Sequence, residues 1–172
     1  DLHLSLRRQR QMCIRDRFSE YANHIGHYAV TGRALGHIFE TLKISEPQLN
    51  LAACTFASGS AGTLAAGDRL KDDYGAKIIA VEALVCPTML YNGYGEHNIQ
   101  GIGDKHIPLI HNVMNTDIVA GISDAATDGL NLVFTTDSGK EYLKSEHQVP
   151  AEIVDNLRHL GFSSICNMMA SI

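Results

Sequence analysis

Long apolar runs, paired cysteines and a basic stripe are all missing from this sequence of 172 residues, whose length predicts a single globular domain. No stretch approaches the roughly 18 to 20 consecutive apolar residues of a membrane-spanning helix, so we expect no membrane partner. The net charge of −5 comes without a basic stripe beyond the first turns, which argues against a nucleic-acid partner. The four cysteines form neither CxxC pairs nor a secreted disulfide spacing, which favours reduced thiols and a cytoplasmic location. Cys54 is expected to be a buried small hydrophobic residue.

Residues 1–17 differ from the rest of the sequence. They hold five arginines and two aspartates, which gives this segment a net charge of +3. Because the whole sequence carries −5, the remaining residues carry a net charge of −8. A targeting peptide or a basic arm would also be arginine-rich, but the apolar core and cleavage site of a secretory signal are absent. QMCIRDR, residues 11–17, resembles peptides translated by mistake from sequencing-adapter DNA, and we interpret residues 1–17 as a non-native leader.

Residues 27–43 predict a helix, because apolar residues recur there at i, i+3, i+4 and i+7 and so share one face. These residues are Leu35, Ile38, Phe39 and Leu42.

A strand, a helix and a second strand follow in quick succession. Residues 49–57 form an almost continuous apolar run, the pattern of a strand buried on both faces. A helix is expected over residues 63–74, closed by Gly75, and a second buried strand over residues 77–83. Such a unit predicts parallel pairing through a right-handed crossover, and hence an α/β fold with a parallel sheet flanked by helices.

The second half of the chain is less regular. Residues 86–112 contain two prolines and several glycines, too irregular for a helix, and a long segment of this kind is expected to line a site. A strand is predicted at 117–122, with Ser123 capping the helix that follows. Residues 135–148 are polar and expected to be exposed, and Pro150 begins a further helix.

The stretch SGSAGT, residues 58–63, lies where the first strand enters its helix. Such a loop directs several unpaired backbone N–H groups to one point, where the helix terminus adds a partial positive charge. Gly59 and Gly62 would let the backbone approach an anion, and hydroxyl groups such as those of Ser60 and Thr63 would donate to it. Because no lysine follows Gly62 and GxGxxG is not matched, a single phosphate monoester fits better than a nucleotide. The alternative is a tight turn that binds nothing.

Three ordered motifs resemble those of cysteine synthases and cystathionine β-synthase-like enzymes, which use pyridoxal 5'-phosphate. HYAVTG (27–32) resembles their HYxxTG element, GSAGT (59–63) their GTGGT phosphate loop, and HNIQGIG (97–103) their HKIQGIG element. IAVEA (79–83) stands where the family has a strand that ends in valine and glutamate. The resemblance implies the tryptophan-synthase-β-like fold, called fold type II.

The resemblance also implies which residues bind the cofactor. The phosphate would be held by the GSAGT loop, and the cofactor and substrate would lie near the second glycine motif. The phosphate-binding residues would be Gly59, Ser60, Ala61, Gly62 and Thr63, and the residues near the cofactor and substrate would be Gly101, Ile102 and Gly103.

The sequence departs from the family at both ends. The family's Schiff-base lysine lies upstream of HYxxTG, whereas the first lysine here is Lys43, so no catalytic residue is assigned. The partner of the cofactor's pyridine nitrogen would follow residue 172. Residues 18–172 are therefore interpreted as a partial domain, truncated at both ends and inactive alone. The full-length protein is expected to be a homodimeric lyase or transferase of amino-acid biosynthesis, performing β-replacement or β-elimination on an amino-acid substrate.

Two further interpretations stay open. A non-catalytic module that senses a phosphorylated metabolite would also need a glycine loop. Among the histidines, His97 is a candidate for acid–base chemistry within the irregular segment. His24, His27 and His37 lack the acidic or cysteine partners of a metal site, so no metal is expected.

Overall fold

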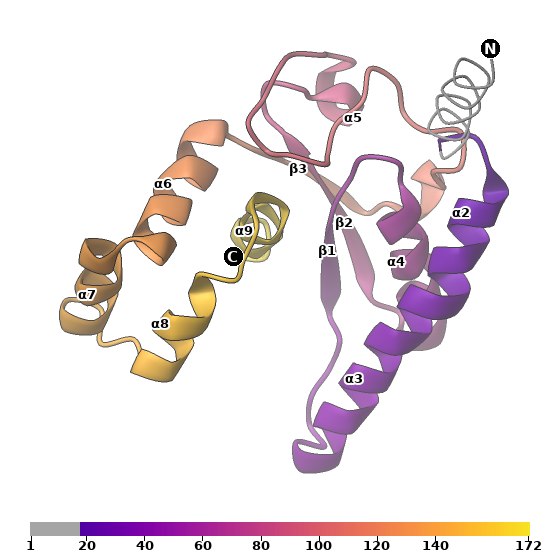
Figure 1. Ribbon diagram of the computed structural model, residues 1–172. Helices are drawn as coiled ribbons and strands as arrows, with labels where there is room; N and C mark the ends of the chain where they lie inside the picture. The colour runs from indigo at the N-terminus through magenta and orange to yellow at the C-terminus, as the bar shows by residue number, and fades with distance from the viewer. Residues whose placement is uncertain (1–17) are drawn as a thin grey trace, which may run out of the picture.

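The computed structural model describes residues 18–172, and the leader predicted at residues 1–17 lies outside this range. The fold is α/β, with a three-stranded parallel sheet in the order β1-β2-β3 and helices on both faces (Figure 1). The strands are β1 (Ala53–Ala57), β2 (Lys77–Ala83) and β3 (Ile118–Ile122). The predicted parallel βαβ unit is confirmed, and β2 has the predicted bounds.

The first strand is shorter and less buried than predicted. Only the last five residues of the predicted strand at 49–57 form β1, and its burial is partial. Within residues 18–172 no strand pairs with the outer side of β1, so β1 is an edge strand. Cys54 is consequently half-buried rather than buried.

One face of the sheet is covered by α4 (Gly62–Tyr74), and a long helical segment packs on α4. The segment consists of α2 (Tyr21–Gly26), a π-helical turn η1 (His27–Thr31) and α3 (Gly32–Ser45). The helix predicted at 27–43 therefore begins earlier, at Tyr21.

The apolar face predicted for α3 is not its buried face. Gly32 and Gly36 are the buried residues of α3, and a Cβ atom at Gly32 would lie 2.6 Å from the Cβ atom of Arg69 on α4. The two helices therefore approach each other through glycine, while Ile38 and Leu42 remain 55% and 52% exposed.

Helix α4 (Gly62–Tyr74) connects β1 to β2. It ends at Gly75, whose φ of +72° lies in the left-handed region that glycine adopts without strain. Beneath α4 lies the first core cluster. Its members include Phe56, Leu64, Leu70, Ile78 and Ala80.

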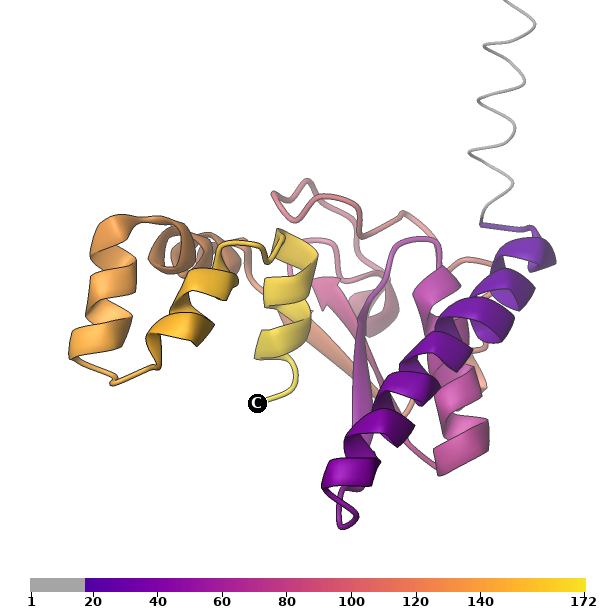
Figure 2. The ribbon, with the colours of Figure 1, turned by 60° about the horizontal axis from the view of Figure 1, so that its bottom comes forward.

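The second half of the chain adds four helices (Figure 2). They are α6 (Asp124–Thr135), α7 (Asp137–Ser145), α8 (Ala151–Leu157) and α9 (Phe162–Met169). Helix α9 packs on the other face of the sheet, while α6, α7 and α8 lie farther from the strands. The Ser123 hydroxyl caps α6 by accepting from the N–H of Ala126 at 3.3 Å, as predicted. The polar segment at 135–148 is mostly exposed, but it folds as α7 because Thr136 caps that helix.

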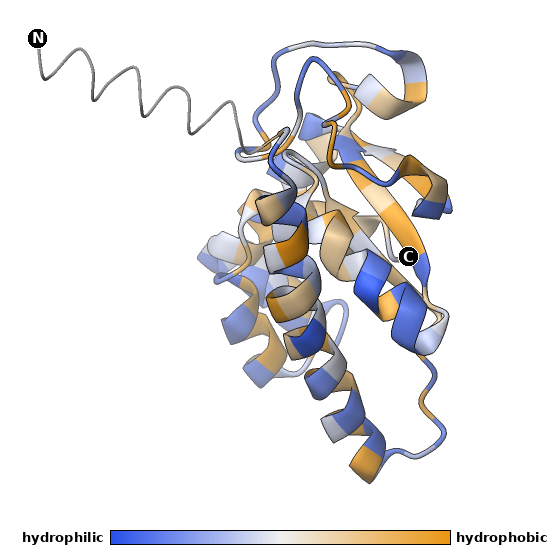
Figure 3. Cartoon of the chain, turned by 90° about the vertical axis from the view of Figure 1, so that its right-hand side faces the viewer, coloured by the Kyte–Doolittle hydropathy of each residue, from blue (hydrophilic) through white to orange (hydrophobic). Residues whose placement is uncertain are grey.

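The helices on both faces carry mixed hydrophobic and hydrophilic residues, whereas the sheet holds continuous hydrophobic stretches (Figure 3). A second core cluster lies between the sheet and α9. It includes Val81, Cys86, Ile99, Ile102 and Cys166. Among the described helices, none combines the length and the hydropathy that crossing a bilayer requires.

Candidate functional site

The glycine loop, residues 58–61, leads from the end of β1 into α4. Within the described part of the chain, the backbone N–H groups of residues 59 to 63 donate to no acceptor. These groups lie at the N-terminus of a helix, where the helix dipole contributes a partial positive charge. The loop therefore offers several donors to an anion, as the sequence predicts.

Ala61 makes the turn into α4 in the left-handed conformation, with φ 62° and ψ 9°. Its side chain is 1% exposed and belongs to the first core cluster. A left-handed residue with a Cβ atom costs about 1 to 2 kcal/mol. The methyl group of Ala61 is thus held inside the protein while its N–H group stays at the loop.

A second loop, at residues 101–103, lies against the first. The N–H of Gly103 donates to the carbonyl oxygen of Ser58 at 2.9 Å. A Cβ atom at Gly59 would lie 2.9 Å from the carbonyl oxygen of Gly101, a distance that real Cβ atoms do not show. Gly101 and Gly103 have φ values of +83° and +81°. The two glycine motifs that sequence analysis singled out therefore meet.

The helical segment formed by α2, η1 and α3 also packs against the glycine loop. The side-chain amide of Asn23 donates to the hydroxyl oxygen of Ser60 at 3.3 Å. A Cβ atom at Gly62 would lie 2.6 Å from the imidazole ring of His27. Gly62 is therefore required for packing against HYAVTG, whereas sequence analysis expected it to make room for an anion.

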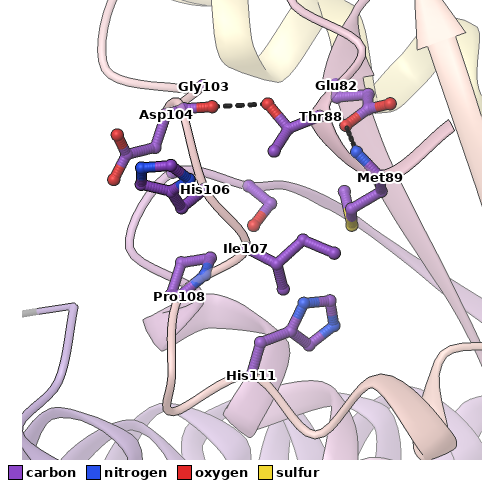
Figure 4. Close-up of a pocket in the computed structure, with 11 residues that line it drawn as sticks. Glu82, Thr88, Met89, Gly103, Asp104, His106, Ile107, Pro108 and His111 are labelled. Atoms are coloured by element: carbon purple, nitrogen blue, oxygen red, sulfur yellow. Dashed lines mark hydrogen bonds between the residues drawn. The ribbon is translucent and has the colours of Figure 1, made fainter. Parts of the chain in front are cut away.

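A cavity opens beside the glycine loop between β2 and the irregular segment (Figure 4). Its walls come from the ends of two strands, the helix α5 (Thr88–Tyr91) and the segment up to the turn η2 (Val113–Asn115). The residues that line it include Ser58, Gly59, Glu82, Gly103, Asp104 and His111. Residues of the irregular segment at 86–112 thus line a cavity, and its use as a binding site stays a prediction.

Three hydrogen bonds support the wall of the cavity. The buried carboxylate of Glu82 accepts from the N–H groups of Met89 at 2.9 Å and Leu90 at 3.0 Å. The hydroxyl of Thr88 donates to the carbonyl oxygen of Asp104 (Figure 4). No motif in the sequence marks these residues as part of a site, although a glutamate inside a buried strand indicates a buried hydrogen-bond partner.

His111 is the half-buried histidine of this cavity. Burial lowers its pKa below the ordinary 6.5, so the imidazole is neutral at pH 7. Its Nε2 atom lies 2.9 Å from the Thr116 hydroxyl. His111 is therefore an uncharged polar group in the cavity wall, with Nε2 next to the Thr116 hydroxyl and a buried Nδ1 atom that has no hydrogen-bond partner among the described residues.

The remaining predicted residues occupy different environments. Ser60 is half-buried and Thr63 is exposed at the loop. Ile102 is 8% exposed and packs into the second core cluster, so only its backbone can approach a ligand. The ring of His97 packs against Gly103 and contributes to the wall of a separate hollow.

One of the three histidines considered as metal ligands, His24, has an acidic neighbour that the sequence did not predict. His24 lies 3.8 Å from a carboxylate oxygen of Asp68. Among residues 18–172, no group of three His, Cys, Asp or Glu residues is arranged to hold a metal ion.

Comparison with known proteins gives structural matches only, since no family model and no curated protein matches the chain. A hydrogen sulfide-producing enzyme from Fusobacterium nucleatum is similar with a TM-score of 0.65 and 23% identity, over 89% of this chain and 40% of that one. O-acetylserine sulfhydrylase isoform 3 from Entamoeba histolytica is similar with a TM-score of 0.62 and 19% identity, over 90% of this chain and 39% of that one. The O-acetylserine-dependent cystathionine β-synthase from Helicobacter pylori is similar with a TM-score of 0.60 and 21% identity, over 90% of this chain and 42% of that one.

The chain has the fold of cysteine synthase-like enzymes, as the three sequence motifs implied. It spans about 40% of the length of the solved structures it matches. The α/β architecture with a parallel sheet is thus part of a tryptophan-synthase-β-like fold.

Proposed function

We propose that this chain carries the cofactor-phosphate site of a pyridoxal-phosphate-dependent enzyme that performs β-replacement or β-elimination on an amino acid. The observation that carries the proposal is the set of free N–H groups at residues 59–63, which the hydrogen bond from Gly103 to Ser58 ties to the second glycine motif. The names of the structural neighbours, which include O-acetylserine sulfhydrylase, support this class of chemistry.

The residues present fit a phosphate monoester. The N–H groups of residues 59–63 donate to its oxygens, and the hydroxyl groups of Ser60 and Thr63 add further donors. The cavity beside the loop has no lysine or arginine among its lining residues, so the backbone and the α4 dipole supply the positive potential. A monoester needs fewer neutralising groups than the chain of phosphates in a nucleotide.

Pyridoxal phosphate, when bound, supplies an electron sink for charge that develops at the substrate's α-carbon. The chain's own residues position it. An added Cβ atom at Gly101 would meet nothing within 4 Å, so this residue leaves space beside the loop, and Glu82 accepts from the N–H groups of Met89 and Leu90 and so fixes α5 in the cavity wall. The lysine that anchors the cofactor is not assigned within residues 18–172, so this chain alone is expected to be inactive.

The intact protein provides the test. We expect the purified protein to show the visible absorbance of bound cofactor, and to bind pyridoxal 5'-phosphate at least about 100-fold more tightly than pyridoxal, which lacks the phosphate. Equal affinities for pyridoxal 5'-phosphate and pyridoxal would contradict the proposal that the loop binds the phosphate. Binding of inorganic phosphate by a protein that binds no cofactor would instead identify a metabolite sensor.

A further inference from the structure

The side chain of Asn23 reaches the glycine loop from α2, a helix that lies beside α4 (Figure 1). Its amide nitrogen donates to the hydroxyl oxygen of Ser60 at 3.3 Å, between residues 37 positions apart in the sequence. Its amide oxygen lies close to the first residue of α4, because a Cβ atom added at Gly62 would be 3.0 Å from that oxygen. The oxygen is thus at the positive end of the α4 dipole, while the nitrogen contacts the loop.

This hydrogen bond limits where the hydroxyl hydrogen of Ser60 can point. A serine hydroxyl has one hydrogen to donate and two lone pairs with which to accept. Because the amide of Asn23 occupies one lone pair, the hydrogen is directed away from it. Among the described residues this hydrogen has no acceptor, and the loop around it presents N–H groups, which are donors as well. The hydrogen is therefore available to an anion that the loop holds.

The part of the helical segment that carries Asn23 is held on α4 by two contacts. The Nε2 atom of His24 lies 3.8 Å from a carboxylate oxygen of Asp68. Asp68 is 6% exposed, and its other carboxylate oxygen accepts from the side-chain amide of Asn115 at 3.0 Å. One turn after His24, the imidazole ring of His27 packs against the start of α4. The amide that reaches the loop is therefore carried by an anchored helix, so its position is set before an anion binds.

We propose that Asn23 is a positioning residue for the phosphate of the cofactor, an inference that rests on the proposed function. Asn23 acts through Ser60: by donating to the hydroxyl oxygen, it leaves the hydroxyl hydrogen for a phosphate oxygen. A carboxylate in place of the amide would accept that hydrogen and withdraw it from the ligand. A carboxylate would also repel the phosphate, whereas the amide adds no charge to a site that lacks lysine and arginine.

The affinities of the intact protein for pyridoxal 5'-phosphate and for pyridoxal test this role, because their ratio isolates the contribution of the phosphate. Asn23→Leu removes the donor without adding charge. We expect it to weaken the binding of pyridoxal 5'-phosphate about tenfold, and that of pyridoxal less than about twofold. The matched control is Asn156→Leu, which removes an exposed amide of α8 and should leave both affinities unchanged.

A double-mutant cycle shows whether Asn23 acts through the hydroxyl of Ser60. In a Ser60→Ala background, Asn23→Leu should cost little further affinity for pyridoxal 5'-phosphate, because the hydroxyl that it orients is already gone. In a Thr63→Ala background, Asn23→Leu should keep its effect of about tenfold. Independent, additive losses for Asn23→Leu and Ser60→Ala would overturn the proposal.

A second variant, Asn23→Asp, keeps the size of the side chain and serves if the leucine variant does not fold. We expect its unfolding midpoint to stay close to that of the parent, and its loss of affinity for pyridoxal 5'-phosphate to exceed that of Asn23→Leu. Parent-like affinity in either variant would overturn the role of Asn23 and leave the proposed function intact. Equal affinities of the parent protein for the two compounds would overturn both.

Discussion

Gly59 and Gly101 approach each other so closely that a Cβ atom at position 59 would lie 2.9 Å from the carbonyl oxygen of Gly101. The obstacle is backbone, which cannot rotate away as a side chain would. The separation of the two glycine motifs is therefore fixed by the absence of a side chain at position 59.

Substituting Gly59 by valine is expected to separate the two motifs. In the intact protein, Gly59→Val should weaken the binding of pyridoxal phosphate by at least about tenfold, which corresponds to about 1.4 kcal/mol. Fluorescence or absorbance titration of the cofactor measures this change. Unaltered affinity would show that the spacing of the two loops does not matter for binding.

The matched control is Gly129, an exposed residue of α6 where an added Cβ atom meets nothing within 4 Å. Gly129→Ala should leave cofactor affinity unchanged. It should also raise the free energy of unfolding by about 0.5 to 1 kcal/mol, because alanine loses less backbone entropy in a helix than glycine does.

The buried carboxylate of Glu82 is a second target. It accepts two backbone N–H groups, and an amide in its place has only one oxygen with which to accept. Glu82→Gln should therefore place a buried side-chain NH2 group against one of these N–H groups, leave both donors without an acceptor, and cost about 1 to 3 kcal/mol of stability, measured by urea unfolding. Glu141→Gln, on the exposed surface of α7, is the control and should change stability little. Similar losses in both variants would argue against the structural role of Glu82.

Local signals in the sequence were sufficient for the elements around the glycine loop. The apolar run of β2 is buried along most of its length, and Gly75 ends α4 in the conformation that glycine favours, so periodicity and turn chemistry agree there. The N–H groups of the loop follow from the same local reasoning, because any strand that enters a helix leaves its first N–H groups free.

Long-range packing accounts for the errors. The apolar pattern of α3 marks a hydrophobic face, but the helix contacts α4 through Gly32 and Gly36, which no periodicity of apolar residues reveals. The partial burial of β1 follows from its place at the sheet edge, a property of strand order rather than of residues 49–57. The contact between Gly59 and Gly101 joins segments far apart in sequence, and only the family resemblance linked them.

Asp117 makes stability depend on pH in the acid range. Its carboxylate accepts from the Lys71 ammonium at 2.8 Å and from the N–H of Ile78 at 2.7 Å. The Lys71 hydrogen bond, followed by that of Ile78, lowers the pKa of Asp117 below its ordinary 3.8. Because the folded-state pKa is lowered, the stabilisation is fully present above the unfolded value of 3.8 and is lost as pH falls through the folded-state pKa.

Asp117→Asn should therefore lower stability at neutral pH and reduce the loss of stability that follows as pH falls below the unfolded pKa of 3.8. Urea unfolding at several pH values measures both effects. Lys71→Met should reproduce most of the change, since the ammonium is the larger cause. An acid dependence identical to the parent's in both variants would contradict this role for the pair.

Gln148, in the connection between α7 and α8, has a φ of +52° and an exposed side chain. A Cβ atom in this left-handed conformation costs about 1 to 2 kcal/mol, part of which glycine returns through its larger entropy in the unfolded chain. Gln148→Gly should therefore raise the free energy of unfolding by about 0.5 to 1 kcal/mol. Gln148→Ala removes the same side-chain atoms beyond Cβ but keeps the strain, so it should give no such gain. Urea unfolding of the two variants separates the backbone effect from loss of the side chain, and an alanine variant as stable as the glycine variant would refute the strain at this position.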